Sequence, residues 1–320
     1  MDGPPTDPPA VLLCGEVRTG LLPARDAVDE RTAARLLRLR ADERVRLSRR
    51  PVRHAVSPDV LTGVDCRLPA ADARIRAVGT VAARAVLVEG RVLQTTAHFR
   101  LPSAGDDRRR PWGHYLVRPG LLVPVGRFRA GAVADGHLAG RRPDELDTGA
   151  IAEALAARIS RRRELDHDPP LRTPVTALRW SALPATEGTA PSLSLTVDDR
   201  LRTLRLRIPG DLAPALVAAF CEDLALHDWL LTTVGDRLDG LRPATADDTA
   251  LLATLRPLVD HLLHLWLPRA RLDSTLAPLW DVLEDTTGFT RQWESLAQRI
   301  RDQLAIRALT GRTTAEGTGR

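Results

Sequence analysis

The chain has 320 residues, which is enough to form a hydrophobic core without disulfide bonds or a structural metal. All 46 of its basic residues are arginine, and the net charge is +5. Its three cysteines are widely spaced, which argues against a disulfide framework or a zinc site, and no apolar run reaches the length of a transmembrane helix. We therefore expect a cytoplasmic protein that does not span a membrane.

Charge is unevenly distributed along the chain. Residues 1–208 carry 35 arginines and 25 acidic residues, whereas residues 209–320 carry 11 and 16. This asymmetry indicates two regions with different surroundings and a basic surface for an acidic partner. Arginine without lysine is typical of a GC-rich genome, in which arginine serves as the general surface cation. The high arginine content is therefore weak evidence for nucleic-acid binding. We do not expect a nucleic-acid partner, and a salt-sensitive gel shift would test this.

The first part of the chain is predicted to be rich in strands. Residues 1–10 are proline-rich and are predicted to form a disordered lead. The clearest hairpin spans residues 84–101 and turns at Glu89-Gly90; on its return strand Leu93, Thr95, Ala97, Phe99 and Leu101 alternate with Gln94, Thr96, His98 and Arg100. The other predicted elements are, in chain order, a strand at 11–17, a helix at 29–40, a loop at 102–111, a helix at 151–164 and strands at 173–183, 192–198 and 201–208.

After residue 208 the apolar spacing becomes helical. Pro214 falls in the first turn of a helix that is predicted to run to about residue 238. Further helices are predicted at residues 248–267, where Pro257 should introduce a kink, at 273–285, and from residue 289 onward. The predicted fold is therefore α+β. A mixed, largely antiparallel sheet region at 11–208 precedes a helical bundle at 209–310 and a disordered tail at 311–320.

Two segments of the helical region share the pattern Asp-x-x-x-His-x-Trp-Leu. Asp223 and His227 belong to the first, and Asp260 and His264 to the second, each pair one helical turn apart. One interpretation is a metal site or an acid–base pair, because helical bundles bind metals between carboxylates and histidines. In an antiparallel hairpin, however, the two histidines would lie about 13 Å apart along the axis, too far to share an ion. We therefore predict that each Asp accepts a hydrogen bond from its His, that both pairs are structural, and that no metal or cofactor binds.

A second concentration of polar chemistry lies at residues 108–118. Guanidinium groups bind phosphates and carboxylates, and aromatic rings stack on bases. The candidate residues for binding a ligand or a partner are Arg110, Trp112, His114, Tyr115 and Arg118. The alternative interpretation is a solvated arginine run followed by aromatic residues that attach a strand to the core. The sequence contains no glycine-rich phosphate loop and no short catalytic motif, so we predict no catalytic residue.

One combination of short segments spans nearly the whole chain. It comprises Gly15 to Thr19, Val56 to Pro58, Leu61 to Cys66, Pro111 to Leu116, Arg118 to Gly120, Cys221 to Thr233, Asp260 to Trp266, Gly288 to Trp293 and Arg299 to Leu304. This combination resembles a family of uncharacterised actinobacterial proteins that are typically encoded near a variant P-loop protein and a methyltransferase-like protein. The resemblance transfers no catalytic residue. It implies a component of a multi-protein system, with the P-loop-type protein encoded nearby as a candidate partner.

These observations lead to two main hypotheses about function. The first is a non-catalytic interaction or regulatory subunit of a cytoplasmic system, because the chain combines charge asymmetry and a tryptophan-rich helical region with no catalytic motif. The second is an enzyme, or a sensor of an anionic or phosphorylated metabolite or nucleotide, that uses the segment 108–118. A structure distinguishes the two: a ligand site requires that residues 108–118 line an open pocket, rather than pack flat against the core.

Overall fold

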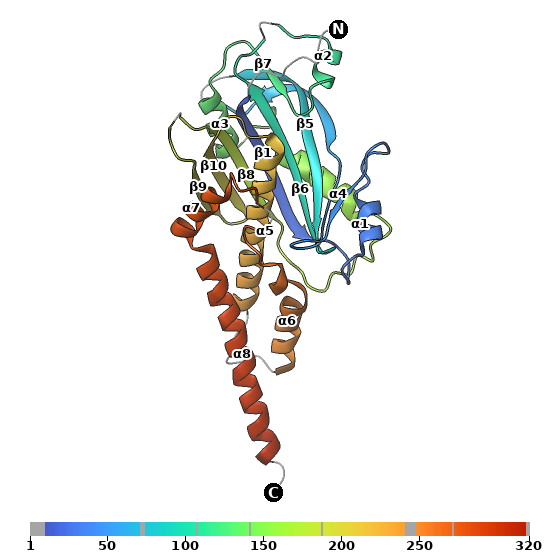
Figure 1. Cartoon of the computed structure of the whole chain (residues 1–320). Helices are drawn as coiled ribbons and strands as arrows, with labels where there is room; N and C mark the ends of the chain where they lie inside the picture. Colours follow the sequence, from blue (N-terminus) through green and yellow to red (C-terminus); the bar gives the residue numbers. More distant parts are fainter. Residues whose placement is uncertain are drawn as a thin grey trace.

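The computed structural model describes residues 10–70, 74–106, 108–140, 142–186, 188–240, 248–270 and 272–317. Within these residues ten strands form one mixed sheet (Figure 1). The strands are β1 (Ala10–Leu21), β2 (Arg46–Ser48), β3 (His54–Val56), β4 (Val60–Leu68), β5 (Ile75–Val88), β6 (Val92–Pro102), β7 (Leu122–Val125), β8 (Thr176–Pro184), β9 (Ser192–Asp198) and β10 (Leu201–Ile208).

The strand order is β2-β3-β5-β6-β1-β8-β10-β9, and β4 and β7 pair with β5 outside this path. Every described pairing is antiparallel except that of β8 with β10. The predicted hairpin is formed by β5 and β6, and it turns at Glu89 and Gly90, whose φ angles of 49° and 63° suit a type I′ turn. The prediction of an α+β protein with a mixed, largely antiparallel sheet is confirmed.

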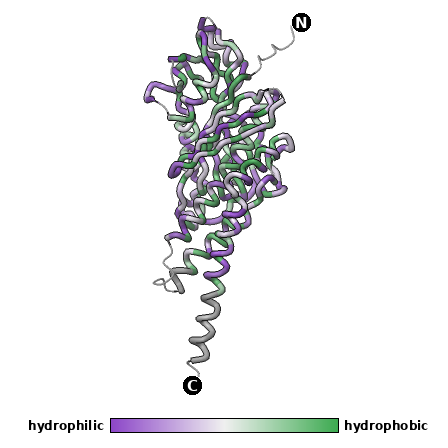
Figure 2. Tube along the Cα trace, turned by 90° about the vertical axis from the view of Figure 1, so that its left-hand side faces the viewer, coloured by the Kyte–Doolittle hydropathy of each residue, from purple (hydrophilic) through white to green (hydrophobic). Residues whose placement is uncertain are grey.

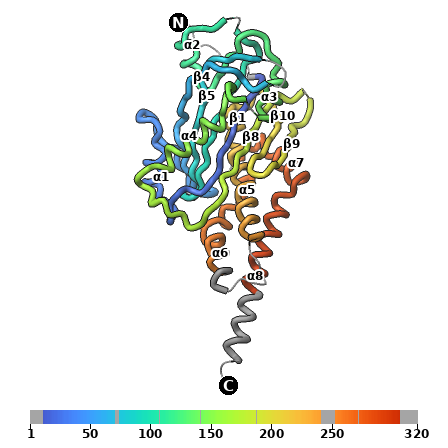
Figure 3. Tube along the Cα trace, turned by 180° about the vertical axis from the view of Figure 1, so that it is seen from behind, coloured from blue at the N-terminus to red at the C-terminus, as the bar shows by residue number. Residues whose placement is uncertain are grey.

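Helices cover both faces of the sheet. The described helices are α1 (Glu30–Leu36), α2 (Trp112–Leu116), α3 (Ala130–Ala139), α4 (Thr148–Ser160), α5 (Pro214–Asp239), α6 (Asp248–His261), the 3-10 helix η1 (Leu263–Leu265), α7 (Ala277–Thr287) and α8 (Phe289–Gly317). Helix α5 lies on the face that Figure 1 presents, whereas α3 and α4 lie on the face seen from behind in Figure 3. Helix α8 extends well beyond the sheet, at the other end of the molecule from α2 (Figure 1).

Strand alternation divides the sheet into two buried faces. On β6, Ala97 and Phe99 belong to the core on the side of α4, whereas Gln94, Thr96 and His98 are buried on the side of α5. The alternation predicted for this strand is therefore confirmed, and the side toward α5 is the polar one. Apolar residues gather along the strands and the packed helices, and polar residues gather in the outer loops (Figure 2).

The core continues from the sheet into the helices across residue 208. One cluster contains Trp180 of β8, Leu204 of β10, Leu224 of α5 and Ile300 of α8. The helical region is thus packed onto the sheet by α5, because α5 supplies apolar residues to both.

The predictions of a disordered lead and a disordered tail compare differently with the structure. The predicted lead lies outside the described residues except for Ala10, with which β1 begins. Helix α8 continues to Gly317 and so includes most of the residues that were predicted to form a disordered tail. Within the described part of the chain, every helix is too short or too polar to cross a lipid bilayer.

Candidate functional site

The segment at residues 108–118 folds onto the end of β5 and carries the short helix α2. Tyr115 is fully buried beside Val78 and Leu121, and its hydroxyl oxygen accepts a hydrogen bond from the backbone N–H of Arg110 at 2.8 Å. The Tyr115 ring packs edge-to-face against His114, with the ring centroids 5.2 Å apart. Tyr115 therefore attaches the segment to the core. The second interpretation predicted this role for both Trp112 and Tyr115 on a strand, but the segment is helical and Trp112 is partly exposed.

The other side of α2 faces solvent. Trp112 is 37% exposed, Leu116 is 56% exposed and Val117 is 69% exposed. Arg109 lies over the Trp112 ring at 5.7 Å from its centroid and forms an ion pair with Asp65 at 3.0 Å. Arg110, Trp112 and His114 are thus gathered around Tyr115, whose carbonyl oxygen also accepts a hydrogen bond from the Arg118 backbone N–H. Tyr115 lies inside the core and Trp112 on the surface.

The first Asp-His pair lies in the middle of α5, and both side chains are buried. His227 Nδ1 is 2.7 Å from the backbone carbonyl oxygen of Asp223 but 3.7 Å from the carboxylate, which corrects the predicted hydrogen bond to the side chain. The imidazole packs edge-to-face against Trp266 and Trp280, with ring centroids 5.0 and 5.3 Å away. Trp266 stacks in turn on Trp293 at 4.6 Å. The two similar motifs therefore meet through His227 and Trp266.

The second Asp-His pair is not arranged as predicted. Helix α6 ends at His261, so Asp260 and His264 do not lie one turn apart on a continuous helix. Asp260 forms an ion pair with Arg256 at 3.3 Å instead. Within the described residues, no group of three or more His, Cys, Asp and Glu side chains is arranged to hold a metal ion.

A buried ion pair that the sequence analysis missed links the sheet to α5. Arg84 of β5 donates to Glu222 of α5 through Nε and Nη2, both at 2.8 Å, and Arg84 is only 4% exposed. Thr96 also donates to the Glu222 carboxylate at 2.7 Å, and Gln94 donates to the backbone oxygen of Glu222 at 2.7 Å. Burial and the nearby charge of Arg84 lower the pKa of His98 to about 4, so this ring is neutral at pH 7.

A second buried pair lies on the other flank of α5. Arg202 of β10 contacts the Asp228 carboxylate at 2.5 Å, and it donates to Thr232 Oγ1 and to the Asp199 carbonyl oxygen, both at 2.6 Å. Burial raises the pKa of Asp228 to about 6, although Arg202 opposes the shift. These contacts occupy all three nitrogen positions of the Arg202 guanidinium.

Each buried pair lines its own pocket. The Arg202–Asp228 pair lines a groove of about 830 Å³ between α5, β9 and the start of α8. The Arg84–Glu222 pair lines a pocket of about 480 Å³ between α5 and the β2–β3 hairpin, which we call the hairpin pocket. None of the five candidate residues at 110–118 lines either pocket.

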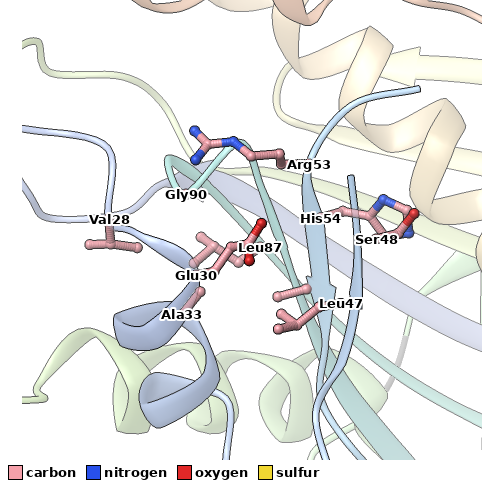
Figure 4. A pocket seen from close by; sticks show the side chains of 10 residues that line it. Val28, Glu30, Ala33, Leu47, Ser48, Arg53, His54, Leu87 and Gly90 are labelled. Carbon is pink, nitrogen blue, oxygen red and sulfur yellow. The ribbon is translucent and has the colours of Figure 1, made fainter. Parts of the chain in front are cut away.

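A third cavity lies on the opposite side of the same hairpin. It holds about 20 Å³, room for about one water molecule, between α1 and the hairpin. In Figure 4 the side chains of Ser48 and His54 lie on the other side of β3 from Leu47 and Ala33. Leu47, Ser48 and His54 line both the small cavity and the hairpin pocket, so the hairpin forms the wall between them.

The two buried arginines left a signal in the sequence. Arg84 shares the strand phase of Val86 and Val88, and Arg202 shares that of Leu204. A charged residue in the phase of the core needs a buried partner. The partners lie on α5, too far along the chain for local periodicity to reveal them.

Comparison with protein-family models, with curated proteins and with solved structures finds no match to this chain.

Proposed function

We propose that the protein is a non-catalytic interaction subunit of a cytoplasmic multi-protein system, and that it binds its partner through the exposed side of α2. The observation that carries this proposal is the cluster of Trp112, Leu116 and Val117, which we call the α2 patch. Large apolar side chains that gather on a surface mark interaction sites more often than isolated ones do.

The α2 patch is held in place before any partner binds. Tyr115 anchors α2 from below, and Arg109 packs over the Trp112 ring. Ordering side chains at an interface costs free energy, so a fixed tryptophan favours binding. Tryptophan and arginine are also the residue types that most often dominate the energy of an interface.

Charge indicates what kind of partner fits. Arg108, Arg109 and Arg110 are exposed next to the patch, and the first 208 residues carry a net charge of +10. An acidic protein surface with an apolar centre complements this arrangement. The P-loop-type protein expected from the resemblance is the candidate to examine first.

A photo-cross-linking residue in place of Leu116 tests the proposal in the native host. We expect a cross-link to one protein, through a peptide rich in Asp and Glu, that weakens as the salt concentration rises. Replacing Trp112 by Ala should lower the affinity about 30-fold, as for an interface hot spot. The matched control is Leu252→Ser with Val259→Ser, which removes two exposed apolar residues from α6 and should leave the cross-link intact.

The proposal fails if the protein remains monomeric and uncross-linked, or if nucleic acid is captured. A sensor of anionic metabolites built on Arg110 and His114 is the alternative for the same segment. It predicts a ligand-induced rise in Tm that disappears in the Arg110→Ala, His114→Ala variant, and an intact rise in Trp112→Ala would favour it over a protein partner.

A further inference from the structure

The hairpin pocket is lined by one face of the β2–β3 hairpin and of β5. Cross-strand pairing places Arg46 opposite Val56 and Ser48 opposite His54, so all four point to the same side. His54 pairs with Val88 of β5, and Arg84 shares the strand phase of Val88. Strand alternation thus brings arginines from two distant strands to one pocket.

The guanidinium of Arg84 retains a free donor. Nε and Nη2 bind Glu222, and Nη2 is also 3.4 Å from the Ala215 carbonyl oxygen. Among the described residues, Nη1 makes no hydrogen bond. Arg84 is held rigidly by Glu222 at the bottom of the pocket, which orients the remaining N–H groups without any ligand.

Two further arginines line the pocket above Arg84. Arg46 and Arg50 are exposed, and within the described part of the chain neither side chain forms an ion pair. Arginines elsewhere on this surface do form such pairs, for example Arg49 with Glu30 at 2.7 Å and Arg53 with Glu89 at 2.9 Å. Arg46 and Arg50 are therefore available for an anion.

The rest of the pocket supplies a helix N-terminus and an apolar wall. Ala215, Leu216 and Ala219 in the first turns of α5 line it, and none of the side chains that the structure describes caps this helix. The positive end of the helix dipole favours an anion at this position. Leu216, Val56 and Leu272 form an apolar wall beside the charged groups.

We propose that the hairpin pocket binds a small organic phosphate, with the phosphate held by Arg46, Arg50 and Arg84 and the organic part against Leu216 and Val56. The three lining arginines outnumber Glu222 and the neighbouring Asp59, so the pocket keeps a net positive charge, which suits the dianionic phosphate monoester near pH 7. The volume of about 480 Å³ lies within the range of small-molecule sites. Guanidinium groups also bind phosphate oxygens in a bidentate manner, which gives specificity.

The test measures binding to the full-length protein by calorimetry with four probes: phenyl phosphate, inorganic phosphate, benzoate and benzyl alcohol. We expect phenyl phosphate to bind best, inorganic phosphate more weakly, and benzoate and benzyl alcohol at least tenfold more weakly than phenyl phosphate. Binding at the same affinity by benzoate would overturn the assignment to phosphate. Absence of binding by either phosphate would overturn the site.

Variants locate the binding within the pocket. Arg46→Gln and Arg50→Gln should each weaken phenyl phosphate about tenfold or more, the usual loss for a hydrogen bond to a charged group. The matched control is Arg207→Gln, an exposed arginine of β10, which should bind normally. Equal weakening in this control, or normal binding in both pocket variants, would contradict the proposal.

Two more variants sharpen the assignment. Leu216→Ser should reduce the preference for phenyl phosphate over inorganic phosphate. Asp59 interacts electrostatically with Arg84 and Arg46, so Asp59→Asn should strengthen the binding of phosphate. Weaker binding in Asp59→Asn would contradict the charge argument. The pocket shares no residue with the α2 patch, so this proposal and the proposed function fail independently.

Discussion

Arg84 and Arg202 both extend from the same face of the sheet and pair with an acidic residue of α5, but the two pairs are built differently. Arg84 binds Glu222 through two nitrogens and retains Nη1, whereas Arg202 uses all of its nitrogens on Asp228, Thr232 and Asp199. In the second pair each guanidinium nitrogen has a contact within the fold. In the first pair, among the described residues, Nη1 of Arg84 has no such contact and can donate to a ligand.

The pockets that the two pairs line also differ in the charged residues around them. Arg46 and Arg50 stand exposed beside Arg84 and form no ion pair within the described residues, whereas the groove beside Arg202 combines apolar residues with Arg291. A buried ion pair contributes little net stability compared with apolar residues of the same shape, because removing both charges from water is costly. Both pairs line a pocket, so this criterion does not separate them; the additional arginines beside Arg84 make positioning for binding the better explanation of the first pair.

The largest expected effect comes from breaking the first pair. Glu222→Ala leaves the Arg84 guanidinium buried without its carboxylate, which should lower the free energy of unfolding by about 3–5 kcal/mol. Urea unfolding measures the loss. The double variant Arg84→Met, Glu222→Leu removes both charges and should regain most of the stability. A single variant that is as stable as the wild type would show that the pair is not desolvated.

The next largest effect is the pH dependence of stability that His98, near the first pair, should cause. The pKa of His98 is about 4, below the ordinary value of 6.5, so the unfolded chain binds a proton that the folded chain does not between these two pH values. Stability should therefore fall as the pH drops from 6.5 toward 4, by on the order of 3 kcal/mol for this group.

Measuring the free energy of unfolding against pH checks this expectation. His98→Gln should flatten the slope but not abolish it, because burial also lowers the pKa of His137 on the opposite face to about 4. An unchanged slope in His98→Gln would show that His98 stays exposed to solvent.

The second pair should respond to pH in the opposite direction. Burial raises the pKa of Asp228 from 3.8 to about 6, so the folded chain holds a proton that the unfolded chain has lost in this interval. The stabilising contribution of Asp228 therefore falls as the pH rises from 3.8 to 6. Asp228→Asn should cost about 2 kcal/mol more at pH 4.5 than at pH 7. A cost that is independent of pH would contradict the raised pKa.

The smallest effect separates binding from stability at the first pair. Arg46→Gln and Arg50→Gln alter exposed side chains, so each should change the free energy of unfolding by less than about 0.5 kcal/mol. The same variants are expected to weaken phosphate binding. Chemical unfolding in the absence of phosphate measures the stability term, and a loss of more than about 1 kcal/mol would assign these arginines to the fold.

Sequence reasoning succeeded where the signal was local. Helix α5 was predicted to be capped by Asp211, to hold Pro214 in its first turn and to run to about residue 238; it begins at Pro214 after the N-cap Ala213 and ends at Asp239. A proline near its start and apolar residues at helical spacing define it. The β5–β6 hairpin was equally clear from Glu89-Gly90 and the alternation that follows.

It failed where the signal was weak or distant. Strands β2, β3, β4 and β7 and helix α3 had no prediction. Three- and four-residue strands such as β2, β3 and β7 carry too little periodicity to recognise. The side-chain hydrogen bonds predicted for the two Asp-His pairs were wrong. The helix ended before His264, and the backbone oxygen of Asp223 was closer to His227 than the carboxylate was.

By itself the sequence determined the α+β class, the main elements and which residues share a face, because these follow from the short-range periods of the strand and the helix. Only the tertiary structure decided that Arg84 meets Glu222, 138 residues further along, and that the β2–β3 hairpin brings Arg46 to the same pocket. Contacts of this kind depend on strand order and on the packing of α5, and no local period encodes them.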